Sequence, residues 1–120
     1  MQSTGNTPPL RIKNKDKWIE TERKRWCRLF SIPIAADAPA GFPINTLPIQ
    51  RCLSAIALKH PDRLVPALDR FYEEVWGPKR NEVCAHDPKQ GLPKVLGEVL
   101  GESGAKEVMG ATVSLRFCLW

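Results

Sequence analysis

The residues best suited to bind a ligand lie near the start of the chain, in the run Thr-Gly-Asn-Thr-Pro-Pro at positions 4–9. Gly5 can adopt backbone angles that other residues avoid, and Asn6 tolerates them nearly as well. The two prolines that follow fix φ and hold the threonine before them in an extended conformation. The pattern predicts a stiff, extended loop whose Asn6 amide can hydrogen-bond an outside partner, although such loops more often only connect a strand to a helix.

A thiol, an imidazole and a carboxylate follow one another closely in Cys84-Ala85-His86-Asp87. A metal centre or a Cys–His catalytic pair would need further groups at compatible spacing, and the sequence shows none. We therefore expect an ordinary exposed loop here and no metal site.

Basic residues are concentrated at positions 11–28, where eight Lys and Arg stand against three acidic residues. The segment therefore carries a net charge of +5, equal to that of the whole chain. It could attract nucleic acid, an acidic membrane surface or a small anion. The alternative that we favour is a solvated helix face, on which Glu20 and Lys24 form a supporting i,i+4 pair.

The composition, with 42% hydrophobic and 26% charged residues in 120, is that of a single soluble globular domain. The sequence has no apolar run of about 18 residues, so we expect no membrane span. The four cysteines, at positions 27, 52, 84 and 118, are irregularly spaced and form no Cys-x-x-Cys. This usage suits a reduced, intracellular compartment.

Helical periodicity dominates the chain between a loop segment at 1–13 and an atypical tail at 111–120, so that 14–110 is expected to be a helical domain. Four or five helices are predicted in it: 14–30, 47–58, a third ending at 76, a fourth from 88 to 100, and a short fifth from 103 to 109. The tail alternates apolar and polar residues from 112 to 119, which suits a strand. Pairing with another molecule, disorder and an artefact of the chain end all remain open for it.

Helix boundaries follow from single residues. Asn14 and Thr46 are expected to be N-caps, and Pro48 is acceptable in the first turn of the second helix. Pro66 should either kink the third helix or mark its first turn. His60 is expected to interact with free carbonyls at a helix end.

The core is expected at the second helix, which is apolar nearly all round and must be covered by its neighbours. Large apolar residues at helical spacing define the faces that should pack: Trp18, Ile19, Trp26, Leu29, Phe30, Leu64, Leu68, Phe71, Tyr72, Val75, Trp76, Leu92, Val95, Leu96, Val99 and Leu100.

Several motifs, taken in order, resemble the kappa-class glutathione transferases and the related 2-hydroxychromene-2-carboxylate isomerases of the DsbA-like thioredoxin superfamily. Lys15 and Trp18 follow the opening loop at the family's spacing. The resemblance covers about residues 4–109 and continues through Gly41-Phe42-Pro43, Asn45-Thr46-Leu47-Pro48, Arg51, His60-Pro61 and Trp76.

The resemblance implies a mainly α chain that corresponds to the helical insertion domain of a DsbA-like thioredoxin fold, with the thioredoxin sheet largely absent. It implies glutathione as the cofactor, with Asn6, Lys15 and Trp18 as binding residues, and glutathione or a small electrophile as the partner. An amide can pair with the peptide backbone of glutathione, and an ammonium group suits its carboxylates. The family occurs in mitochondria and peroxisomes, but no signal for either is visible.

Two departures bear on activity. The family's catalytic serine follows a strand that should precede Thr4, and Ser3 does not correspond to it. The family's closing strands, with their cis-proline, should follow Met109, yet residues 110–120 contain no proline. We therefore expect a truncated member in which catalysis is lost, and we leave open whether the chain is an enzyme. Its uncovered apolar faces predict self-association.

Two function classes follow from the sequence. The first is a glutathione-dependent transferase or isomerase of kappa type, inherited by resemblance and retained as a fragment. The alternative is a non-enzymatic helical binding module whose basic first helix docks an acidic partner, with nucleic acid the less expected one.

Overall fold

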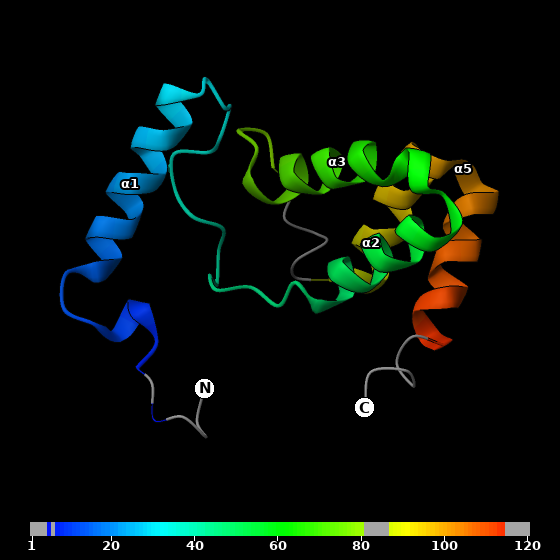
Figure 1. Ribbon diagram of the computed structural model, residues 1–120, viewed down its shortest axis with the longest axis horizontal. Coiled ribbons are helices and arrows are strands. Elements are labelled where there is room, and N and C mark those ends of the chain that lie inside the picture. The colour runs from blue at the N-terminus through cyan, green and yellow to red at the C-terminus, as the bar shows by residue number, and fades with distance from the viewer. Residues whose placement is uncertain (1–4, 6, 81–86, 115–120) are drawn as a thin grey trace. The chain divides into compact units, whose positions relative to one another are not determined.

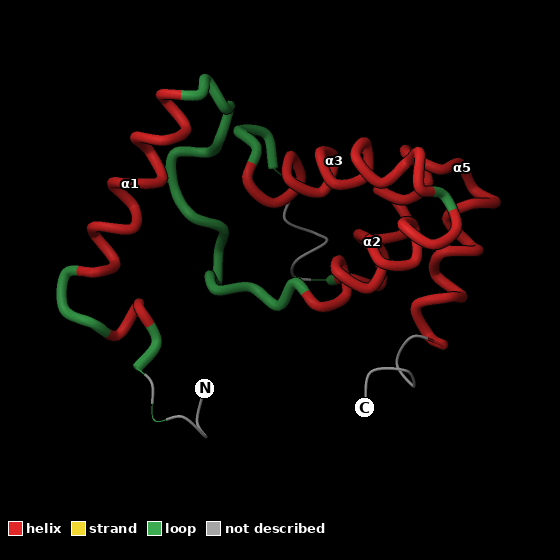
Figure 2. Tube along the Cα trace, in the orientation of Figure 1, coloured by secondary structure: helices red, strands yellow, loops and turns green. Residues whose placement is uncertain are grey.

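A computed structural model describes residues 5, 7–80 and 87–114 of the chain (Figure 1). These residues are helices, turns and loops, and the prediction of a mainly α protein is confirmed (Figure 2). The chain divides into two units, Met1–Pro33 and Ile34–Trp120, each of which is described by itself. None of the helices in the described ranges is long and apolar enough to span a membrane.

The first unit begins with the opening loop. Gly5 has a φ of 63°, a left-handed conformation that glycine adopts without strain. Pro8 is extended, with φ −56° and ψ 140°, but the extended stretch ends there. Pro9–Arg11 forms the short 3-10 helix η2, because the Arg11 N–H donates to the Pro8 carbonyl at 2.9 Å. The prediction of an extended loop is therefore wrong at its last residue, Pro9.

Helix α1 spans Lys15–Leu29, close to the predicted range. The expected N-cap, Asn14, precedes it in a left-handed conformation with φ 64°, and its side chain makes no capping hydrogen bond. The prediction of an Asn14 cap is therefore wrong, because an N-cap residue needs extended backbone angles to aim its side chain at the first free N–H groups. At the other end, Ser31 is also left-handed, and the Ile32 N–H donates to the Cys27 carbonyl at 2.8 Å.

The second unit contains α2 (Leu47–Lys59), the 3-10 helix η3 (Pro61–Arg63), α3 (Leu64–Trp76) and α5 (Pro88–Ser114). Helix α2 packs against both α3 and α5, and α3 also packs against α5. The core lies where these three helices meet, as predicted for α2. Its buried hydrophobic members are Ile49, Cys52, Leu53, Ala55, Ile56, Ala67, Phe71, Val75, Leu92, Val95, Leu96, Ala105 and Val108.

The start of α2 differs from prediction in its cap. The Thr46 side chain makes no capping hydrogen bond, and Oδ1 of Asn45 instead accepts from the Leu47 N–H at 3.1 Å. Thr46 already has helix-like angles, φ −87° and ψ −2°, so its hydroxyl is not placed to cap. Pro48 and Pro66 both lie in the first turn of their helices, as expected.

His60 follows α2, but its ring does not meet a free carbonyl. Its Nε2 lies 3.1 Å from Oε2 of Glu107 on α5, and Nζ of Lys59 lies 2.8 Å from the other oxygen of that carboxylate. The His60 N–H donates to the Ile56 carbonyl at 2.7 Å, so the predicted contact with a carbonyl at the helix end is made by the backbone. The ring instead pairs with a charged carboxylate on a neighbouring helix, which is a stronger acceptor.

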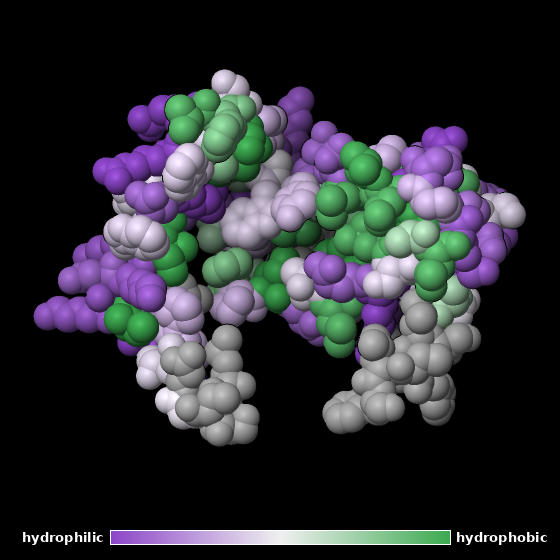
Figure 3. Space-filling view, in the orientation of Figure 1, coloured by the Kyte–Doolittle hydropathy of each residue, from purple (hydrophilic) through white to green (hydrophobic). Residues whose placement is uncertain are grey.

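The buried face of α3 is narrower than the predicted stripe. Phe71 and Val75 are buried, together with Ala67 and the carboxylate residue Glu74. Leu68 and Tyr72, in contrast, are 38% and 59% exposed. Hydrophobic side chains accordingly reach the surface over the helices of this unit, as Figure 3 shows.

Helix α5 combines the predicted fourth and fifth helices. It opens at Pro88, where Oδ1 of Asp87 accepts from the Lys89 N–H at 3.1 Å. Gly101, with φ 74° and ψ 172°, breaks the helical geometry as expected and separates two halves. The second half continues past Met109 to Ser114, so residues 112–114 are helical and the prediction of a strand is wrong for them. The remainder of that predicted strand lies outside the described residues.

Candidate functional site

The predicted ligand residues lie in the first unit. Asn6 is outside the described residues, whereas Lys15 and Trp18 both belong to the first turn of α1. Residues three apart are neighbours on a helix surface, so the Lys15 ammonium group and the Trp18 indole border the same patch. Trp18 is 60% exposed and therefore available for contact with a ligand.

The N-terminal end of α1 favours an anion. No side chain caps it, since Asn14 turns away from the capping geometry. A helix N-terminus carries unsatisfied N–H groups and a partial positive charge. Lys13, Lys15 and Lys17 surround this end and form no ion pair with a described residue, while Asp16 is the acidic residue of the first turn. The arrangement can hold a carboxylate.

Further along α1, acidic residues neutralise part of the basic segment. Glu20 accepts hydrogen bonds from Arg23 at 2.7 Å and lies 3.0 Å from Nζ of Lys24, which confirms the predicted Glu20–Lys24 pair. The hydrogen bonds from Arg23 and then Lys24 lower the pKa of Glu20 to about 2. Glu22 pairs in the same way with Arg25 at 3.1 Å. The positive charge of the α1 N-terminus is thus less compensated than that of its middle.

An aromatic cluster lies near the C-terminal end of α1. The rings of Trp26 and Phe30 stack with centroids 5.8 Å apart and planes 11° from parallel. Trp26, Leu29 and Phe30 are all more than half exposed, and α1 contains no buried residue. The face that the sequence assigned to the core is therefore apolar but has no cover within its own unit.

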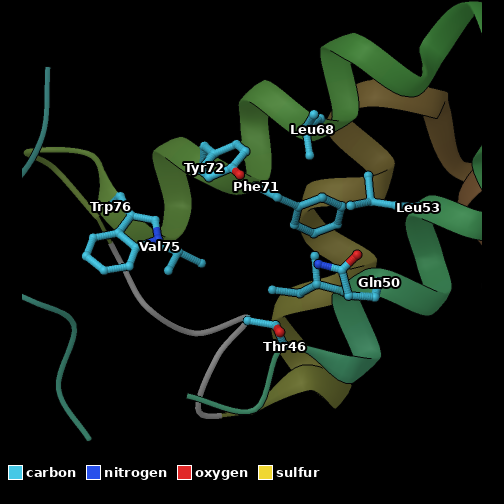
Figure 4. A pocket seen from close by; sticks show the side chains of 9 residues that line it. Thr46, Gln50, Leu53, Leu68, Phe71, Tyr72, Val75 and Trp76 are labelled. Carbon is cyan, nitrogen blue, oxygen red and sulfur yellow. The ribbon is translucent and has the colours of Figure 1, made fainter. Parts of the chain in front are cut away.

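A pocket that the sequence did not predict opens between α2 and α3 in the second unit (Figure 4). It has a volume of about 180 Å³. Leu53 and Phe71 approach each other in its middle, Gln50 extends from α2, and Tyr72 and Trp76 lie along α3. The lining is apolar with a few polar groups, which is the usual character of a small-ligand site. Tyr72 and Trp76, two aromatic residues with polar groups, were the sequence signal that could have indicated this pocket, but the sequence analysis assigned both to the core.

The loop before α2 is fastened to the end of α3, beside this pocket. The Ala35 N–H donates to the Trp76 carbonyl at 2.7 Å, and the Arg80 guanidinium donates to the carbonyls of Asp37 and Ala38. The Phe42 ring meets Trp76 edge-on, with centroids 5.6 Å apart. These contacts fix the position of Trp76, one of the pocket's lining residues.

The two cysteines within the described residues, Cys27 and Cys52, do not belong to a catalytic or metal-binding site. Cys52 is buried, and burial raises its pKa to about 11, so its thiol stays protonated. Cys27 on α1 is half-buried. Cys84 and His86 lie outside the described residues, as does Cys118. In the ranges 7–80 and 87–114, no group of three His, Cys, Asp or Glu side chains could hold a metal ion.

The fold and these sites define the chain as a mainly helical protein. No family model matches it, and neither the curated proteins nor the solved structures contain a significant match.

Proposed function

We propose that this protein binds glutathione and is related to the kappa-class glutathione transferases, with Asn6, Lys15 and Trp18 as ligand-binding residues. The order of the sequence motifs motivates the proposal. The observation that carries it is the uncapped N-terminal end of α1, where Lys15 stands beside an exposed indole. The proposal concerns binding of the tripeptide.

The chemistry of the first turn of α1 suits glutathione in two respects. The Lys15 ammonium group and the free N–H groups of the turn can both interact with a carboxylate, and glutathione carries two. The Trp18 indole offers an apolar surface for the rest of the tripeptide, and its N–H can donate a hydrogen bond.

Calorimetric titration of the full chain with glutathione tests the proposal. Lys15→Gln should weaken binding by about tenfold, the scale of one charge-assisted hydrogen bond. Lys24→Gln is the matched control, because Lys24 lies on the same helix but already pairs with Glu20. Asn6→Ala should also weaken binding. Equal affinities for the native chain and Lys15→Gln would contradict the assignment.

Tryptophan fluorescence gives a second reading of the same site. Glutathione should change the emission of Trp18, and the change should vanish in Trp18→Leu but persist in Trp26→Leu, whose target residue is stacked on Phe30. Because exposed apolar residues on α1 favour self-association, sedimentation should first establish the concentration at which a single species is present.

A second candidate function rests on α1 as a whole. Its apolar face is uncovered within its own unit, and Lys17, Lys24 and Arg28 lie on the opposite side at helical spacing. An amphipathic basic helix of this kind can dock an acidic protein surface. We propose such a docking helix as the alternative to glutathione binding.

Polyanions distinguish the two candidates. A poly-glutamate peptide and a single-stranded oligonucleotide should bind with a steep salt dependence if α1 is a docking helix. Combined Lys13→Gln, Lys17→Gln and Arg28→Gln changes should abolish that binding, whereas neutralising Arg23 and Lys24 should have less effect because Glu20 already pairs with both. Glutathione binding without polyanion binding would exclude the docking helix.

A further inference from the structure

A second pocket in the helical unit combines cationic and apolar groups and is separate from the proposed glutathione residues. It lies between α2 and α5 and has a volume of about 280 Å³. Arg51 and Lys89 bring positive charge, and Thr112 and Cys52 bring a hydroxyl and a thiol. The rest of the lining is apolar: Pro48, Pro88, Leu92 and Met109.

The Nε atom of Arg51 is the unusual feature of this pocket. It is inaccessible to solvent and has no hydrogen-bond partner among the described residues. A buried N–H group without an acceptor destabilises a fold, and the effect is larger when the group is charged. Native proteins nearly always provide an acceptor for such a group. The guanidinium of Arg51 also forms no ion pair in the described ranges, unlike that of Arg70, which pairs with three carboxylates.

The surroundings of Arg51 favour an anion as the partner of its guanidinium charge. The Lys89 side chain forms no ion pair with a described residue and borders the same pocket. Pro48 and Pro88 belong to the first turns of α2 and α5, so the positive ends of two helix dipoles lie beside it. Burial raises the pKa of Cys52 to about 11, which leaves this thiol uncharged. The Thr112 hydroxyl already donates to the Met109 carbonyl at 2.7 Å.

The apolar part of the lining limits the kind of anion. Leu92 is buried and Met109 is half-buried, and both face the pocket with the two prolines. An inorganic ion would leave this surface without a partner, whereas a short hydrocarbon chain would cover it. The volume lies just below the range of pockets that take drug-sized molecules, so the ligand is small.

We propose that the pocket between α2 and α5 binds a small organic carboxylate, whose oxygens accept from the guanidinium of Arg51 and from Lys89 and whose hydrocarbon chain packs on Leu92 and Met109. The site goes beyond the proposed glutathione function, since it uses neither Lys15 nor Trp18. The two proposals can therefore be tested independently of each other.

Nitrogen-15-edited NMR on the full chain tests the site, because an arginine Nε–H gives its own resonance. Titration with hexanoate should shift the Arg51 Nε–H resonance in a saturable way. Hexanol has the same chain without the charge, and inorganic sulfate has charge without the chain. Each should bind about tenfold or more weakly, since one lacks the charge-assisted hydrogen bonds and the other lacks the apolar contact.

Variants separate the site from a general charge effect. Arg51→Met should weaken hexanoate binding by about tenfold or more, while Arg63→Met, at an exposed arginine outside the pocket, should leave it unchanged. If Arg51→Met does not fold, Lys89→Gln is the second variant, with Lys94→Gln on the same helix as its control. Lys89→Gln should weaken binding about threefold, as expected for an exposed charge.

Three outcomes would overturn the proposal. The first is an Arg51 Nε–H resonance that does not respond to hexanoate. The second is equal binding of hexanol and hexanoate. The third is hexanoate binding that survives both Arg51→Met and Lys89→Gln. Loss of glutathione binding in Lys15→Gln with an unchanged hexanoate response would leave this site intact.

Discussion

The Nε–H of Arg70 on α3 donates to Oε2 of Glu98 on α5 across 2.8 Å. The same guanidinium donates through Nη1 to Glu74 at 2.9 Å. Glu74 is 5% exposed, so a buried carboxylate in α3 depends on Arg70 for its counter-charge. The arginine thereby joins a buried group to a partner on a second helix.

Replacing Arg70 should therefore lower the free energy of unfolding more than replacing Glu98 does. Arg70→Met should lower the free energy of unfolding by about 3 kcal/mol, because it leaves the Glu74 carboxylate buried and unpaired. Glu98→Gln should cost less than about 1 kcal/mol, since Glu98 is largely exposed. Urea denaturation measures both, with Arg63→Met as the exposed control. If Glu74→Gln does not relieve part of the Arg70→Met defect, the buried charge is not its cause.

Replacing Gly97 or Gly101 of α5 by alanine should change the stability of the protein in opposite directions. Gly101 has φ 74° and ψ 172°, a region almost closed to other residues, so Gly101→Ala should destabilise the protein by about 1–3 kcal/mol. Gly97 is helical with open space around its Cβ position, so Gly97→Ala should stabilise by about 0.5–1 kcal/mol. Thermal unfolding of the two variants and of the native protein measures both changes in stability. A stable Gly101→Ala protein would mean that α5 can straighten.

Acid should weaken α1 within a defined pH range. The hydrogen bonds from Arg23 and Lys24 lower the pKa of Glu20 to about 2, below its ordinary value of 4.5. A lowered folded-state pKa gives stability that is present above pH 4.5 and is lost as the pH falls toward 2. The carboxyl carbon shift of Glu20 should follow a titration with this low midpoint. In Arg23→Gln the midpoint should rise, and an unchanged midpoint would exclude Arg23 as the main cause.

Thiol labelling should discriminate Cys52 from Cys27. Burial raises the pKa of Cys52 to about 11, whereas Cys27 is only half-buried. Because the thiolate is the reactive form, iodoacetamide at pH 8 should modify Cys27 first and Cys52 only after denaturation. Peptide mapping by mass spectrometry identifies each site. Rapid labelling of Cys52 in the native protein would show that the α2–α5 contact opens readily.

Sequence periodicity predicted the helices well because their spacing signals are long. The apolar face of α2 and the series Leu92, Val95, Leu96, Val99 and Leu100 each extend over two turns or more, and the first three of these α5 residues are buried. Proline and glycine positions also fixed boundaries reliably. Pro88 opens α5, and Gly101 breaks it, because both act through the local backbone.

Interactions that depend on a distant partner could not be predicted. The His60 ring contacts the carboxylate of Glu107, which lies 47 positions later, and no local sequence pattern predicts that pairing. Tyr72 has the spacing of a core residue, yet it lies at the rim of a pocket whose other wall belongs to α2. The first turn of α1 shows the same limit on a smaller scale, since the left-handed angles of Asn14 remove the expected cap.

The break at Gly101 also changes the electrostatics of α5. A continuous helix of 27 residues would have one positive and one negative end. The non-helical backbone angles of Gly101 interrupt the alignment of the peptide dipoles and divide the helix dipole in two. The second half therefore begins with its own electropositive turn, and Glu102 stands there, where a carboxylate is favourable. The first N–H groups of a helix have no intrahelical partner. Hydrogen exchange should accordingly find a rapidly exchanging end in the middle of the longest helix.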